Sequence, residues 1–299
     1  PHSQIRCVEC HVGGGAEWYV RSKFSGMRQL YGVITGDYNK PIQTPVHNMR
    51  SANETCQKCH WSEKFHGDKL KLFNHYGYEE KNSLKQNRML IKIGGGSAEG
   101  GQVGGIHWHM NISNEISYIS DDDKRETIPW VRMKGADGKI VEFMSKDKPL
   151  SPAQIETANK RKMDCVDCHN RPTHIYLSPN QAIEVLSKPY TTNDEAVSTI
   201  AAEMNSYYLQ NHAGVYAARS DTVKVAIAEV QRIYQTYFFP EMKTNWSTHA
   251  NNIGHYNAQG CFRCHDGQHF SNEGKVIRNE CSICHTTVDQ TFGGKTIAA

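Results

Sequence analysis

Apolar residues recur at helical spacing in several segments of the chain. In residues 18–31 the apolar positions that share one helical stripe are Val20, Phe24, Met27 and Tyr31. Two further helices are predicted at about residues 194–210 and 221–239, and the second ends where Pro240 removes a backbone donor. A shorter helix is predicted to begin after Ser151, its cap, and to run toward the next cysteine.

Four short segments in the middle of the chain have the composition of β-strands. They are rich in β-branched and aromatic residues and lie at 89–93, 115–119, 127–131 and 140–144. Asp137-Gly138, between the last two segments, is typical of a hairpin turn. The pattern as a whole predicts a mainly α fold with extensive irregular loops and a small β-rich insertion at about residues 85–145.

Composition limits the class of protein. Of the 299 residues only 38% are hydrophobic and the mean hydropathy is −0.65, so the side chains alone supply little core. No run of about 18 apolar residues is present, and no transmembrane helix is expected within this stretch. The net charge of +3 gives nucleic acid no basic footprint, so no nucleic-acid partner is expected.

All ten cysteines occur in one repeated motif, C-x-x-C-H. The five cysteine pairs are Cys7 and Cys10, Cys56 and Cys59, Cys165 and Cys168, Cys261 and Cys264, and Cys281 and Cys284. In one helical turn this spacing lets two thiols form thioethers with the vinyl groups of a haem while the next histidine faces the iron. The predicted proximal ligands are His11, His60, His169, His265 and His285.

Two other uses of cysteine fit this motif less well. Zinc sites pair two C-x-x-C knuckles and do not require a histidine after each one, and a disulfide scaffold is typical of shorter secreted chains. We therefore expect five covalently bound c-type haems, around which the helices and loops wrap and whose apolar surface replaces missing core side chains. The motifs predict a dihaem segment at 1–75, a β-rich haem-free insertion at 76–150 and a helical trihaem segment at 151–299.

The other histidines supply candidates for the distal axial ligands. Seven are favoured: His2, His75, His107, His109, His174, His255 and His269. Four of these lie four to six residues from a motif, too near to pass round a porphyrin edge, so each is expected to cap a neighbouring haem. In a strand His107 and His109 would share a face, so one is expected to ligate and the other to hydrogen-bond a haem propionate. Methionine ligation stays an open alternative.

Several stretches resemble the NapC/NirT family of multihaem cytochromes, in particular the larger inner-membrane members of metal-respiring bacteria. The segments that carry the resemblance are the first motif with His2 before it, Glu54–Trp61, Gly105–His109, Met163–His174 and Asn252–His269. The resemblance implies quinol oxidation at the outer face of the cytoplasmic membrane, with electrons passed to periplasmic carriers. It also implies a membrane anchor and an earlier haem, which we expect to precede Pro1.

Three functions are compatible with these motifs. The first is outer-sphere electron transfer along a row of mostly bis-histidine haems, between quinol or redox partner proteins and periplasmic or extracellular acceptors. The second is a reductase with one open haem, although no motif departs from C-x-x-C-H. The third is a homo-oligomer or conductive filament in which His2 ligates a haem of the next copy.

Because haem is attached to c-type cytochromes after export, a periplasmic or cell-surface location is expected, with anchoring to the cytoplasmic membrane.

Overall fold

The fold contains more β-structure than the sequence pattern predicts. The computed structural model describes residues 2, 4–13, 15–45, 52–61, 65, 67–77, 79, 81–95, 104–110, 114–174, 184–256, 258–292 and 295–298. Of these residues 39% are helical and 21% lie in strands, which form two antiparallel sheets of four and five strands. The expectation of a mainly α fold with a small β insertion at about 85–145 is therefore wrong.

The chain divides into two compact units. The first comprises Pro1–Tyr19, His47–Arg171 and Ala250–Ala299, and the second comprises Val20–Val46 and Pro172–His249. All five C-x-x-C-H motifs lie in the first unit. The division into three segments at residues 75 and 150 stays a prediction.

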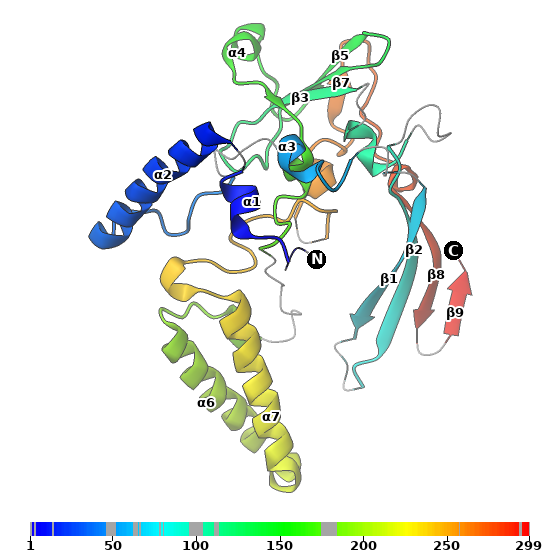
Figure 1. The fold of residues 1–299 in the computed structure, drawn as a ribbon. Helices are drawn as coiled ribbons and strands as arrows, with labels where there is room; N and C mark the ends of the chain where they lie inside the picture. The colour runs from blue at the N-terminus through cyan, green and yellow to red at the C-terminus, as the bar shows by residue number, and fades with distance from the viewer. Residues whose placement is uncertain are drawn as a thin grey trace. The chain divides into compact units, whose positions relative to one another are not determined.

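The four-stranded sheet belongs to the first unit and has the order β1-β2-β8-β9, with its strands side by side (Figure 1). Its strands are β1 (Asp68–Tyr76), β2 (Leu84–Lys92), β8 (His285–Phe292) and β9 (Lys295–Ala298). Most of β1 is exposed and β8 is largely polar, so neither has the apolar run that marks a strand in the sequence. An ion pair between Arg88 and Asp289 joins β2 to β8.

The five-stranded sheet, also in the first unit, has the order β6-β3-β4-β5-β7. Its strands are β6 (Arg161–Lys162), β3 (Glu115–Ile119), β4 (Trp130–Lys134), β5 (Ile140–Ser145) and β7 (His269–Ser271). The predictions of β3 and β5 are confirmed. The strand predicted at 127–131 begins three residues later, at Trp130, because Pro129 has no amide hydrogen to give to a ladder. Tyr118 and Trp130 are each only 1% exposed in this sheet.

The second unit contains a helical hairpin, α6 (Asn193–Asn211) and α7 (Ala213–Tyr237). Both helices are predicted from the sequence, but α7 begins eight residues before the predicted start at 221. Its backbone is non-helical at Arg219, so the predicted helix corresponds to the part of α7 that follows this break. The buried residues that join the two helices are Leu186, Ala196, Ile200, Val230, Tyr234 and Phe238.

The remaining helices are mostly short. They are α1 (Cys7–His11), α2 (Ala16–Thr35), α3 (Ala52–Cys56), α4 (Pro152–Thr157), α5 (Cys165–Cys168), η3 (Ile106–Met110), η4 (Glu184–Ser187), η5 (Pro240–Met242), η6 (Gly260–Arg263) and η7 (Cys281–Ile283). The helix predicted at 18–31 is confirmed as part of α2, whereas α4 stops well before the next cysteine. Ser151 caps α4 as predicted, in a capping box with Gln154. Within the described residues, no helix has the length and hydropathy needed to cross a membrane.

Candidate haem-binding sites

Each of the five motifs contains or adjoins a short helical turn. The turns are α1, the end of α3, α5, η6 and η7. In three motifs the histidine amide donates back to the carbonyl of the first cysteine, as from His60 to Cys56, over 2.8–3.0 Å. This turn places the two thiols and the imidazole of one motif close together. All ten cysteines are free thiols, so none is used in a disulfide.

Four motif histidines each lie opposite a histidine from another part of the first unit. The ring centroids are 6.1 Å apart for His2 and His60, 6.2 Å for His107 and His169, 5.7 Å for His109 and His265, and 6.2 Å for His255 and His285. Each pair therefore combines the predicted proximal ligand of one motif with one of the predicted distal candidates.

The spacing of these pairs fits an iron between the two rings. An imidazole nitrogen lies about 2 Å from a bound metal, so the centroids of two imidazoles on opposite sides of one metal are about 6 Å apart. The four measured separations, 5.7–6.2 Å, agree with that value. The donor set is also the one that six-coordinate haem iron takes in low-potential electron carriers.

Backbone carbonyls fix the orientation of three of these rings. The Nδ1 atoms of His107, His109 and His265 lie 2.9, 3.1 and 2.5 Å from carbonyl oxygens. A carbonyl can only accept, so each Nδ1 carries the proton and donates it. The opposite nitrogen, Nε2, is then the unprotonated atom that can bind a metal, which is how metal-binding histidines are commonly oriented.

Burial keeps several of these imidazoles neutral. It lowers the pKa of His107, His109, His169 and His285 below the ordinary value. A neutral imidazole is the form that binds a metal. Burial also raises the pKa of the Cys168 and Cys264 thiols to about 12 in the unmodified chain.

His107 and His109 are arranged differently from the sequence expectation. They lie in the 3₁₀ helix η3 rather than in a strand. Residues two apart in a 3₁₀ helix point about 120° away from one another, whereas in a strand they would share a face. The structure accordingly places His107 beside His169 and His109 beside His265. The sequence alone could not reveal this, because a five-residue segment carries no clear periodicity.

The other three distal candidates have different surroundings. His269 is 2% exposed, and its two ring nitrogens lie 2.8 Å from the Asp266 carboxylate and 2.7 Å from the Ile128 carbonyl, so neither is directed at a metal. His75 lies on β1 beside Tyr256, with ring centroids 5.8 Å apart. His174 is exposed, as is His11 of the first motif.

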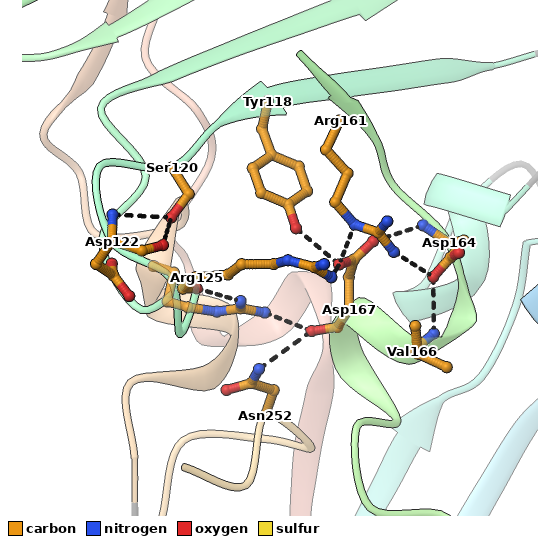
Figure 2. A network of polar contacts seen from close by, with 10 residues as sticks. Tyr118, Ser120, Asp122, Arg125, Arg161, Asp164, Val166, Asp167 and Asn252 are labelled. Atoms are coloured by element: carbon orange, nitrogen blue, oxygen red, sulfur yellow. Dashed lines mark hydrogen bonds and ion pairs between the residues drawn. The ribbon is translucent and has the colours of Figure 1, made fainter. Parts of the chain in front are cut away.

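Neighbouring motifs also contact one another within the first unit. The Cys56 thiol is hydrogen-bonded to the Cys165 thiol, which raises the pKa of Cys56. Burial raises the pKa of Cys284, and the nearby Cys261 raises it further. A polar network is centred on Asp167 in the third motif (Figure 2). Arg263 of the fourth motif donates to the Asp167 carbonyl and so joins the two motifs. The second to fifth motifs therefore follow one another in space in the order of the sequence.

Paired cysteines on helical turns outside any disulfide, with histidines facing one another across the width of an iron, are the features of a multihaem c-type cytochrome. Comparison with known proteins supports this class. The chain is similar to the cytochrome c-type protein ImcH of Geobacter sulfurreducens, with 45% identity over 311 residues that cover 97% of the chain and 61% of that relative. It thus spans less than two thirds of the relative's length. The similarity to a cytochrome c-type protein also indicates an exported or membrane-associated protein.

No protein-family model matches the chain, and no solved structure matches it.

Proposed function

We propose that the chain carries five covalent haems and transfers electrons between them by outer-sphere steps. The observation that supports this most directly is the set of four histidine pairs, each spaced as two axial ligands of one iron would be. Haem supplies an iron that changes between its ferric and ferrous states without making or breaking a bond. The chain's part is to hold that group and to fix its two ligands.

The pairs support a proposed set of ligands for four of the five haems. His60, His169, His265 and His285 are the proximal ligands, and their respective distal ligands are His2, His107, His109 and His255. His2 and His255 each face a motif other than the one that follows them in the sequence. A ligand drawn from a different segment ties two parts of the chain to one iron. His11 is the proximal ligand of the fifth haem.

Two ligands at each of four irons support electron transfer over reduction of a substrate at haem. A reductase needs an open axial position for its substrate, whereas in the proposed arrangement an imidazole would take both axial positions of each of these four irons. A filament joined through His2 is also less favoured, since His2 lies beside His60 of its own chain. We further propose that electrons pass from the membrane quinol pool to periplasmic or extracellular acceptors, which is supported by the resemblance to the NapC/NirT family.

Two measurements on the purified holoprotein count its haems. They are the intact mass of the chain and the absorbance of the complex that its haem forms with pyridine. The proposal predicts five haems per chain, attached so firmly that acid and solvent do not extract them. Extraction of the haem, or fewer than five haems per chain, would contradict it. Reduction of the holoprotein by a quinol analogue tests whether quinol is the electron donor. Quinol would be excluded as the donor if a strong chemical reductant reduced the holoprotein and the quinol analogue did not.

A further inference from the structure

A buried carboxylate lies inside the third motif. Asp167, between Cys165 and Cys168, is only 3% exposed. Its Oδ1 accepts hydrogen bonds from the Tyr118 hydroxyl at 2.7 Å, from Arg125 at 3.2 Å and from Arg161 at 2.9 Å. Figure 2 shows these side chains converging on it. The second oxygen accepts the amide of Asp164 at 2.8 Å. The Asp167 side chain therefore forms ion pairs with two guanidiniums.

A third guanidinium reaches the same place from the fourth motif. Arg263, between Cys261 and Cys264, is 8% exposed. Its nitrogens donate to the carbonyl oxygens of Asp167 at 2.7 Å, Arg125 at 2.8 Å and Gly260 at 2.9 Å. The charged side chains that meet here are three arginines and two aspartates, because Asp164 also pairs with Arg161 at 3.0 Å. The cluster has a net charge of +1 and touches both motifs.

Packing alone does not explain a cluster of charges in which Asp167 and Arg263 are buried and the other three side chains are partly buried. Burial of an ion pair carries a desolvation cost that can exceed the attraction between the charges, and apolar side chains of similar volume often stabilise a fold as well or better. What charges provide and apolar groups cannot is an electric field. Ferric haem carries one more positive charge than ferrous haem, so a nearby anion favours the ferric state and a nearby cation favours the ferrous state.

We propose that this cluster sets the reduction potentials of the haems attached to the third and fourth motifs, with Asp167 lowering them and Arg125 raising them. The inference rests on the proposed function, since it requires haem at these motifs. It assigns a role to residues that neither bind haem through a thioether nor ligate iron. Loss of one buried unit charge at a low effective dielectric constant is expected to change the ferric/ferrous equilibrium by about tenfold, or ~59 mV for one electron.

Two variants of opposite sign test the proposal. Asp167→Asn removes the anion and should raise at least one midpoint potential of the holoprotein in a spectroelectrochemical titration. Arg125→Gln removes a cation and should lower at least one by a similar amount. Disruption of the fold would move both variants in the same direction, so opposite shifts distinguish an electrostatic role from a structural one.

Two controls complete the experiment. Glu115→Gln removes an exposed anion from strand β3, where solvent screens the charge, and should leave the potentials unchanged. Tyr118→Phe removes a hydrogen bond to Asp167 without a change of charge and should shift them less than Asp167→Asn does. Equal shifts of the midpoint potentials in all four variants would overturn the proposal. So would unchanged midpoint potentials in both Asp167→Asn and Arg125→Gln.

Haem content is measured first in every variant. Wild-type protein without haem would contradict the proposed function itself. Five haems per chain with midpoint potentials that are the same in Asp167→Asn, Arg125→Gln and the wild type would contradict only this inference. Should Asp167→Asn fail to accumulate, the sign of the Arg125→Gln shift decides: a fall supports the proposal, and no fall overturns it.

Discussion

At the scale of single residues, the hydrogen bond made by one ring nitrogen of a histidine decides whether the other nitrogen can bind a metal. Three paired histidines donate Nδ1–H to a backbone carbonyl and keep Nε2 for a metal. His269 has both nitrogens within hydrogen-bonding distance of protein oxygens. Position relative to a motif is visible in the sequence, but the partner of each ring nitrogen is not, because it depends on how the backbone folds. That partner can be as near in the sequence as Ile106 is to His109 or as distant as Ile128 is from His269.

Replacing one distal ligand should open one iron. In the reduced holoprotein His109→Ala is expected to let one haem bind carbon monoxide while all five stay attached, because thioether bonds do not depend on the axial ligand. The difference spectrum with carbon monoxide measures this. His212→Ala is the matched control, since His212 lies against Tyr207 and Tyr208 at the junction of α6 and α7. No binding in His109→Ala, or equal binding in the control, would contradict the assignment.

His269 should instead contribute to stability. His269→Ala leaves the buried Ile128 carbonyl without its hydrogen bond and removes a well-packed ring, so a loss of about 1–3 kcal/mol in the free energy of unfolding is expected. Urea denaturation measures the loss. Carbon monoxide binding should be the same as in the wild type. New binding of carbon monoxide in this variant would show that His269 ligates an iron after all.

At the scale of elements, segments with a strong apolar pattern are predictable and segments without one are not. Strand β3 is found at its predicted position and α6 within one residue of its predicted ends, because each buries one face. Strands β1 and β9 are mostly exposed and β8 is largely polar, so none of the three carries an apolar pattern that predicts a strand. Strand β1 pairs with β2 and β9 pairs with β8, whereas the pairing of β2 with β8 joins segments far apart in the sequence and no local pattern reveals it.

The helical hairpin of the second unit offers a test of packing. Ile200 on α6 is fully buried, whereas Val225 on α7 is 69% exposed. Ile200→Ala should lower the free energy of unfolding by about 2–5 kcal/mol because it leaves a cavity. Val225→Ala should change it by less than about 0.5 kcal/mol. Helical circular dichroism in urea measures both, and equal effects would show that the core is not where the structure places it.

At the scale of the whole molecule, all the proposed haem-binding residues of the four histidine pairs lie in the first unit. It contains all ten cysteines and all eight paired histidines, although it is assembled from three separate stretches of the chain. The number of motifs and their proximal ligands can be predicted from the sequence because each motif is local. The pairing of His107 with His169, or of His255 with His285, cannot, since it depends on how distant segments fold together.

The proposed function requires imidazoles at both axial positions of at least four irons. Low-temperature electron paramagnetic resonance of the oxidised holoprotein, followed by addition of carbon monoxide to the reduced form, measures this. We expect low-spin signals from at least four haems, with carbon monoxide bound by no more than one of the five. High-spin signals and carbon monoxide binding at two or more irons would contradict it.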